Sequence, residues 1–181
     1  MLHSGSGHRC TLGFNATDGA RHFGILPGFC GAPGTTWFAD PERRIPVGTT
    51  TRSWFPTRNY SLITYTNTSL TYPSEVNADG RVVRIEDARE PASSTRICHV
   101  GGATGHRCGA LLGPGIPPVD PDHDFRSDIC SEPGDAGGPA FQGSSAVGII
   151  VGGSGTCATG GTTSYLRITP VLSMAGLRVG H

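Results

Sequence analysis

Short runs of alternating or β-branched residues recur along the chain, and glycine and proline separate them. Examples lie at residues 11–15, 61–65, 81–85, 146–151 and 162–168. The chain contains 28 glycines and 14 prolines, and this content favours tight turns between short strands. Many short strands at such spacing are typical of a β-barrel or a β-sandwich. The pattern therefore predicts an all-β fold.

One segment near the C-terminus has the spacing of a helix instead. Thr169 is a suitable N-cap, Pro170 suits the first turn, and Gly180 follows the last turn. The apolar face would comprise Val171, Leu172, Met174, Ala175 and Leu177. We expect this helix to have a structural role and to pack on the second half of the chain.

Length and charge narrow the function classes. A chain of 181 residues suits one large all-β domain or two small fused barrels, and it can bury a substantial core. The formal net charge is zero, 15% of the residues are charged, and the sequence has no run of basic residues. These features argue against nucleic acid and anionic membranes as partners. No apolar stretch reaches the length of a membrane span, and we expect a monomer.

The most specific motif is Gly-Asp-Ala-Gly-Gly-Pro at residues 134–139. It resembles the Gly-Asp-Ser-Gly-Gly-Pro motif of chymotrypsin-like serine proteases. Other segments resemble the streptogrisin and alpha-lytic protease branch of that family, namely 10–15, 28–30, 55–67, 130–139 and 151–163. The resemblance spans roughly the whole chain.

This resemblance implies two antiparallel six-stranded β-barrels with a cleft between them. The first barrel would comprise residues 1–90, and the second would comprise residues 91–181 with the C-terminal helix. Residues 86–94 would cross from one to the other. Sequence alone leaves the pairing of the six cysteines open, whereas the resemblance implies the disulfides Cys10–Cys30, Cys98–Cys108 and Cys130–Cys157.

The resemblance also shows what stands at each catalytic position. The general base of the family is the histidine of a Thr-Ala-Gly-His-Cys run, and Phe29 takes its place in Leu-Pro-Gly-Phe-Cys. The family aspartate opens an Asp-Tyr-Gly-Ile run, where this chain has Asn59. Ala136 replaces the nucleophilic serine, and Val151 replaces a serine that supports the aspartate.

These substitutions remove the chemistry of the triad. The serine must lose its proton to an imidazole that a carboxylate orients. In this family's triad, replacing the carboxylate alone with an amide costs about 10⁴ in turnover. We therefore expect that the chain has lost protease activity by the triad mechanism.

Parts of the cleft are retained. The backbone N–H groups of Gly134 and Ala136 would form the oxyanion hole and could bind a carbonyl or carboxylate oxygen; alternatively, the glycine is kept only because the turn needs it. The segment Val151-Gly152-Gly153 would be an edge strand that pairs with an extended peptide. The changed residues Phe29, Ala136 and Val151 would give an apolar cleft floor, which suits a hydrophobic ligand or simply a repacked inactive site.

Three charged or titratable residues have candidate roles near the cleft. Asp128 has the spacing of the aspartate that binds cationic groups in trypsin-like relatives, although a surface position is the alternative. In the bacterial branch an arginine follows the first cysteine of the middle loop and pairs with the aspartate of the motif. Here that residue is His99, and we expect a buried His99–Asp135 pair that raises the pKa of the histidine.

We expect no cofactor and no metal, because the cysteines lack Cys-x-x-Cys spacing. The acidic segment 119–125 fits no calcium-loop signature, and we interpret it as a solvated turn. Disulfides indicate an oxidising compartment. We therefore expect a secreted bacterial protein whose export signal and pro-segment are not part of this sequence, or else an intracellular protein of a biosynthetic pathway.

Two functions remain. The first is an inactive protease homologue that binds a peptide or a small apolar molecule in the cleft. The second is a repurposed cyclase, isomerase or lyase, in which the retained donors stabilise a developing enolate or alkoxide. Tyr60 and His22 are the acid–base candidates for that second function.

Overall fold

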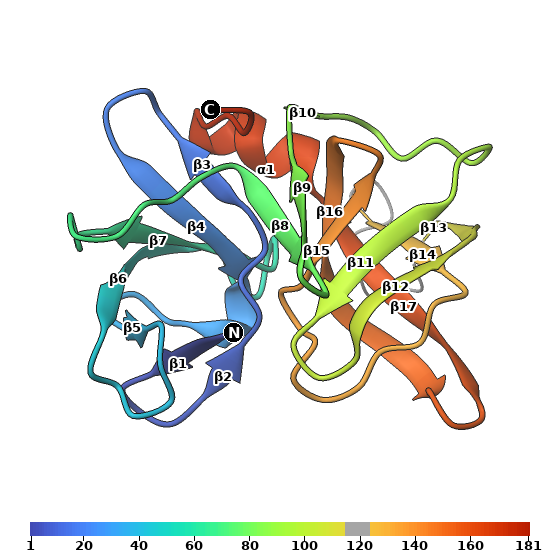
Figure 1. Ribbon diagram of the computed structural model, residues 1–181, viewed down its shortest axis with the longest axis horizontal. Helices are drawn as coiled ribbons and strands as arrows, with labels where there is room; N and C mark the ends of the chain where they lie inside the picture. Colours follow the sequence, from blue (N-terminus) through green and yellow to red (C-terminus); the bar gives the residue numbers. More distant parts are fainter. Residues whose placement is uncertain (115–123) are drawn as a thin grey trace.

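The computed structural model describes residues 1–114 and 124–181. In these residues the structure contains strands, one 3-10 turn and one α-helix. Figure 1 shows two curled halves side by side, with the first half of the chain in blue and cyan and the second in yellow to red. Residues 119–123 of the predicted solvated turn lie outside the described residues, whereas Asp124 and Phe125 are buried in a strand, so the prediction was wrong for these two. No helix in the described ranges is long and apolar enough to cross a membrane.

The first half forms an antiparallel sheet of seven strands in the order β2-β1-β5-β6-β7-β4-β3. A single 3-10 turn, η1 (Gly28–Cys30), directly follows β4. The strands are β1 (Leu2–Ser4), β2 (Arg9–Cys10), β3 (Asn15–Thr17), β4 (His22–Pro27), β5 (Thr36–Phe38), β6 (Pro46–Ser53) and β7 (Tyr60–Tyr65).

The second half forms a larger sheet, whose main path has the order β12-β11-β15-β16-β17-β14-β13. One short parallel strand, β10 (Asp87–Ala88), pairs with β16 outside this path. The strands of the path are β11 (Ile97–Gly101), β12 (Gly105–Gly109), β13 (Leu111–Pro114), β14 (Asp124–Ser127), β15 (Pro139–Gln142), β16 (Ser145–Thr156) and β17 (Gly160–Arg167).

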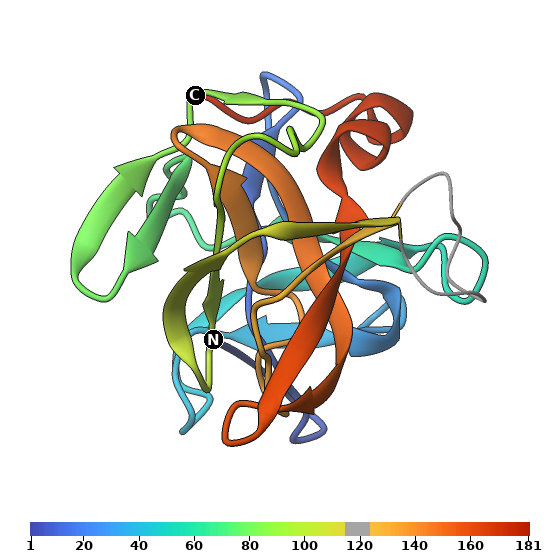
Figure 2. The same cartoon turned by 90° about the vertical axis from the view of Figure 1, so that its right-hand side faces the viewer.

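A separate hairpin, β8 (Glu75–Ala78) with β9 (Arg81–Arg84), connects the two sheets along the chain. Figure 2 shows this hairpin in green at the side of the molecule. The predicted fold class is confirmed: the structure has two curled antiparallel sheets and a C-terminal helix. Each sheet has more strands than the six that we expected, with seven in the first and eight in the second within the described residues. The surplus comes from short strands such as β2 and β10.

The helix α1 (Ile168–Ala175) confirms the predicted C-terminal helix, but both of its ends differ from the prediction: it ends at Ala175, before Leu177 and Gly180, and its N-cap is not Thr169. The cap residue is Arg167, which makes no side-chain capping bond. The Thr169 hydroxyl donates to the Glu90 carboxylate instead, so the prediction of a Thr169 cap was wrong. Gly176 ends the helix at a φ of 67°, a conformation that favours glycine.

Apolar side chains from both sheets form one continuous core between the halves. Ile149 of β16 is fully buried at its centre. After the helix, Arg178 exchanges backbone hydrogen bonds with Thr17 of the first sheet at 2.8 and 2.9 Å. The buried residues of this shared core are Phe14, Ala16, Ile25, Tyr60, Leu62, Val76, Ile85, Phe141, Ala146, Ile149, Leu166, Ile168, Val171, Leu172 and Val179. The two halves therefore share a core, and the cleft residues lie on a rigid framework.

We predict that Ile149→Ala lowers the free energy of unfolding by about 2–5 kcal/mol, because it leaves a cavity in the shared core. Denaturation in guanidinium chloride measures the effect. The control is Val82→Ala, since the Val82 side chain is 60% exposed; it should change stability by less than about 0.5 kcal/mol. Equal effects of the two substitutions would contradict this description of the core.

Candidate functional site

The first two triad positions meet where β4 ends and β7 begins. Pro27 is the register partner of Tyr60 in these antiparallel strands. The turn η1 places Phe29 just after β4, and Asn59 directly precedes β7. The backbone approaches closely here, because a Cβ added at Gly28 would lie 3.0 Å from the Tyr60 nitrogen. The structure therefore brings the Phe29 and Asn59 segments together.

The third position comes from the second sheet. Thr11 donates its backbone N–H to the Ala136 carbonyl at 2.8 Å. Gly137 has a φ of +94°, and an added Cβ would lie 1.9 Å from the Thr11 carbonyl oxygen and 3.2 Å from the Pro27 ring. Only glycine fits this approach. The Ala136 loop is thus docked against the end of β4, beside the turn that carries Phe29.

Phe29 presents an apolar surface where the family has its general base. Its side chain is 46% exposed and meets the ring of Phe55 edge-on, with 6.4 Å between ring centroids and an interplanar angle of 77°. Phe55 is itself 54% exposed. The two rings line a hollow of 280 Å³ together with Gly28, Ala32, Pro33 and Ser53. No side chain of this hollow can act as a base at neutral pH.

Asn59 has a positive φ of 44°, and its side-chain oxygen is buried without a hydrogen-bond donor among the described residues. A buried polar atom without a partner is destabilising. In the family's triad an imidazole and a serine hydroxyl surround this position. Phe29 and Val151, which replace them here, have no side-chain donor. The absence of a donor at Asn59 is therefore consistent with the side chains at positions 29 and 151.

The carboxylate of Asp135 is completely buried and well satisfied. Its Oδ1 accepts the N–H groups of Ala103 and Thr104 at 2.8 and 3.0 Å. Its Oδ2 accepts the Thr104 hydroxyl at 2.9 Å and the Glu132 N–H at 2.8 Å. These bonds tie the loop that carries Gly134 and Ala136 to the β11–β12 turn.

The predicted His99–Asp135 pair is wrong. His99 Nδ1 contacts the Tyr165 hydroxyl at 2.8 Å, and that hydroxyl also contacts Ser127 Oγ at 2.7 Å. His99 Nε2 has no hydrogen-bond partner among the described residues. Burial lowers the pKa of His99 to about 4, although the negative charge of Asp135 acts in the opposite direction. Asp135 is satisfied by other donors. Because burial lowers its pKa, the imidazole of His99 is neutral at pH 7.

The oxyanion-hole segment lines a second cavity, with a volume of 290 Å³. Gly134 has a φ of +109°, so the turn does require glycine. The backbone N–H groups of Gly134 and Ala136 donate to no acceptor within residues 1–114 and 124–181. Glu132 also lines the cavity, and its Oε1 accepts the Cys157 N–H at 2.8 Å. The cavity therefore combines two free donors with a lining in which four of the ten residues are glycines.

The end of β16 borders this cavity. Gly152 and the residues after it pair with β17 on one side, whereas the pairing with β15 ends at Ile149. An added Cβ at Gly152 would meet nothing within 4 Å. Val151 forms the bulge between Ile150 and Gly152, and its side chain packs against the shared core. Phe29, Ala136 and Val151 thus do not form one apolar floor: the first two lie in separate hollows, and the third lines neither.

The remaining candidates lie elsewhere. Asp128 is exposed and does not line the cavity; its carboxylate accepts the Ala110 N–H at 2.7 Å. Tyr60 is buried and stacks on Trp54, with 4.5 Å between ring centroids. His22 is exposed and lies 5.0 Å from the His181 ring. None of the three borders the space in front of the free donors.

Sequence reasoning missed several residues of the site. Thr104 was not expected to hold Asp135, because the turn Gly-Ala-Thr-Gly carries no signal of that contact. Glu132 lies inside the matching segment 130–139, and its place two residues after Cys130 was the available signal. The sequence indicates only that Phe55 belongs to the matching segment 55–67. Its pairing with Phe29 depends on the close approach of η1 to the segment before β7.

Comparisons with known proteins agree with this architecture. Serine protease 2 of Streptomyces fradiae is 32% identical over 90% of this chain and 97% of its own length. Streptogrisin-C of Streptomyces griseus is 35% identical over 96% of this chain. Thermobifida fusca protease A superposes with a TM-score of 0.86 at 31% identity, covering 99% of this chain and 96% of its own. The alpha-lytic protease homolog N4 gives 0.85 at 40%, with coverage of 98% and 95%.

The chain therefore belongs to the streptogrisin and alpha-lytic protease branch of the chymotrypsin-like serine proteases. It spans 46% of the length of Streptogrisin-D and 38% of that of Streptogrisin-C. No family model matches the chain. The three disulfides that the resemblance implied are present, Cys10–Cys30, Cys98–Cys108 and Cys130–Cys157.

Burial of His99 predicts how stability depends on pH. The folded pKa of about 4 lies below the ordinary value of 6.5, so the unfolded chain binds a proton first as the pH falls. The contribution of the neutral His99 ring to the free energy of unfolding is on the order of 3 kcal/mol. This contribution is complete above pH 6.5 and is lost as the pH falls towards 4. We expect His99→Gln to flatten the decline of the melting temperature between these two pH values.

The control is Tyr165→Phe, which removes the hydroxyl partner of His99 and keeps the titrating ring. This variant should retain the pH dependence. Parallel melting curves of the wild-type chain and His99→Gln across that window would contradict the assignment.

Proposed function

We propose that this chain is a catalytically inactive serine protease homologue whose cleft binds an extended peptide or a small apolar molecule without cleaving it. The observation that carries the proposal is the set of side chains at the triad positions. Phe29, Asn59 and Ala136 can neither remove a proton from water nor attack a carbonyl. The three cysteine bridges leave no free thiol as an alternative nucleophile.

Retained backbone groups support binding. A peptide carbonyl can accept hydrogen bonds from the Gly134 and Ala136 N–H groups, which have no acceptor in the described chain. Ile150 still exchanges backbone hydrogen bonds with Gly137 and Gly138, and the side of β16 beyond Ile150 offers further backbone groups to an extended chain, as in β-strand addition. The exposed Phe29 and Phe55 rings supply apolar contact area on the adjacent side.

A repurposed enzyme is the second candidate, and the same two free donors favour it. Its acid–base candidates have weak support, because Tyr60 is buried and His22 lies on a different surface. Glu132 borders the cavity but is already engaged by the Cys157 N–H. Binding without turnover therefore accounts for more of the site. Recovery of a bound small molecule in altered form would support the enzyme instead.

We further propose that the protein acts in an oxidising compartment, as a secreted bacterial protein does. Three disulfides, two of them linking partly exposed cysteines, support this location. A monomer is the proposed state. The neutral net charge gives no support to nucleic acid or an anionic membrane as a partner.

Restoring the triad tests the loss of catalysis. We predict that Ala136→Ser alone leaves peptide hydrolysis undetectable, because an isolated hydroxyl lacks a base. The triple variant Phe29→His, Asn59→Asp and Ala136→Ser should hydrolyse peptide esters at least about 100-fold faster than the single variant. Initial rates on an activated ester measure both. Wild-type hydrolysis as fast as that of the triple variant would refute the proposal.

Filling the cavity tests peptide binding. Gly152→Phe should place a ring in the open space at the end of β16 and weaken binding at least tenfold, on the order of 1.4 kcal/mol, with an unchanged melting temperature. A mixture of short peptides with blocked ends is passed over the immobilised protein, and the retained peptides are identified by mass spectrometry. Their affinities are then measured one by one.

The matched control is Gly5→Phe, because Gly5 is exposed and an added Cβ there also meets nothing within 4 Å. This substitution should leave the affinities unchanged. Retention of no peptide by the wild-type chain, or equal retention by Gly152→Phe, would contradict binding in this cleft.

A further inference from the structure

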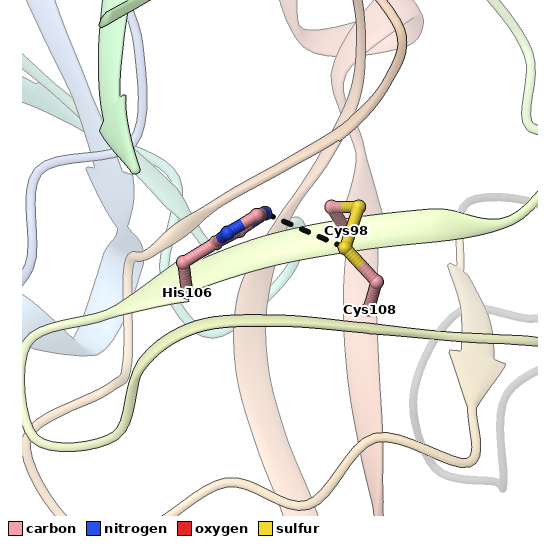
Figure 3. Close-up of side chains that lie close together, drawn as sticks. All are labelled: Cys98, His106 and Cys108. Atoms are coloured by element: carbon pink, nitrogen blue, oxygen red, sulfur yellow. Dashed lines mark hydrogen bonds between the residues drawn. A yellow bond between two sulfur atoms is a disulfide. The ribbon is translucent and has the colours of Figure 1, made fainter. Parts of the chain in front are cut away.

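A cluster of metal-binding side chains lies on the β11–β12 hairpin, outside the cleft. Cys98 and Cys108 are direct register partners in these antiparallel strands, with 4.0 Å between their Cα atoms. His106 precedes Cys108 by two residues and so projects from the same face of the hairpin. Figure 3 shows its ring beside the Cys98–Cys108 disulfide. This is the one such group of three found within the described ranges.

The spacing of the three ligand atoms suits one tetrahedral ion. His106 Nε2 lies 3.4 Å from Cys108 Sγ, and all three ligand atoms lie within 4.8 Å of one another. Tetrahedral zinc with ordinary bond lengths separates its nitrogen and sulfur ligands by roughly 3.5–3.8 Å. The distance from His106 Nε2 to Cys108 Sγ is close to this range, and the main change on metal binding would be the separation of the two bonded sulfurs.

The surroundings give access to the cluster and hold its histidine. Cys98 and His106 line an open cavity of 420 Å³ between this hairpin and β8–β9. The ring of His106 stacks on Phe141, with 6.0 Å between ring centroids and an interplanar angle of 11°. All three ligand residues are partly exposed. A small reductant and an ion can therefore reach the sulfurs, and the imidazole is already oriented.

We propose that reduction of the Cys98–Cys108 disulfide converts this cluster into a zinc-class metal site, with two thiolates and His106 Nε2 as ligands and water in the fourth position. A dithiol supplies two electrons and two protons, leaves as its own cyclic disulfide, and opens the bridge to two thiols. Both thiols then lose their protons as the ion binds. In the oxidising compartment proposed above the bridge is closed, the sulfurs are not thiolates and the site does not form, so the site is confined to reducing conditions.

Local charge is compatible with this site. Arg81 and Arg84 line the same cavity. Positive groups favour the thiolate form of nearby cysteines. Two thiolates and one neutral imidazole around a divalent ion give no net charge, so the arginines do not repel the occupied site. The other two disulfides are not part of any such three-residue group among the described residues.

Cobalt(II) titration of the full-length chain tests the proposal. The protein is treated with a dithiol under anaerobic conditions, the reductant is removed, and alkylation mapping identifies which disulfide has opened. We expect one equivalent of cobalt to bind with a thiolate-to-cobalt charge-transfer band in the reduced chain and no band in the oxidised chain. His106→Gln, which keeps the bridge, should weaken cobalt binding at least tenfold after reduction.

Cys98→Ser/Cys108→Ser serves as the second variant and should show no charge-transfer band under the same treatment. Persistence of the band in this variant would assign the metal to another pair of cysteines and overturn the proposal. Equal affinity in His106→Gln would also overturn it. So would a bridge that opens only together with loss of the folded near-ultraviolet circular dichroism spectrum.

Discussion

The buried carboxylate of Asp135 is the constraint on which the cleft depends. A buried negative charge is tolerated only where hydrogen-bond donors surround it. Here the donors are the backbone of Ala103, Thr104 and Glu132 together with the Thr104 hydroxyl. Because they belong to two separate segments, the carboxylate fixes the loop of the second sheet in one position. That position leaves the Gly134 and Ala136 N–H groups without internal acceptors.

This constraint is independent of the triad. The donors to Asp135 are main-chain N–H groups and one hydroxyl, and none of them belongs to Phe29, Asn59 or Ala136, the residues that the resemblance places at the triad positions. The side chains at and beside the triad positions differ from this well-satisfied carboxylate. The Asn59 side-chain oxygen is buried without a donor among the described residues, and the partly buried Val151 packs against the shared core. In the proposed function, such a site still binds a carbonyl although it lacks the groups that would cleave the peptide.

Much of the fold could be predicted from the sequence, because motif and pattern agree. The Gly-Asp-Ala-Gly-Gly-Pro motif fixed the family, and the family implied both sheets, the three disulfides and the triad positions. Elements set by tertiary contacts were missed. We expected His99 to take the place of an arginine, but it contacts the Tyr165 hydroxyl instead. Asp135 accepts backbone N–H groups, which every residue except proline carries, so the sequence could not indicate these donors. Thr169 turns to Glu90 rather than capping the helix.

The group of Cys98, His106 and Cys108, for which we propose a metal site, illustrates the same limit. Cys-x-x-Cys spacing is absent, and spacing along the chain gave no reason to group Cys98 with His106. Strand register brings them together. Cys98 lies opposite Cys108 in the hairpin, and His106, two residues before Cys108, projects from the same face. Asp128 shows the converse. Its spacing suggested a pocket, but the Ala110 N–H holds its carboxylate outside the cavity.

The most direct test of the central claim is covalent labelling of the wild-type chain with a fluorophosphonate, read by intact mass spectrometry. The reagent reacts with a serine that a neighbouring imidazole activates. With Phe29 and Ala136 at the positions of base and nucleophile, we predict an unchanged mass after prolonged incubation, while an active relative such as a streptogrisin is fully labelled. A stoichiometric phosphonyl adduct on the wild-type chain would contradict the account.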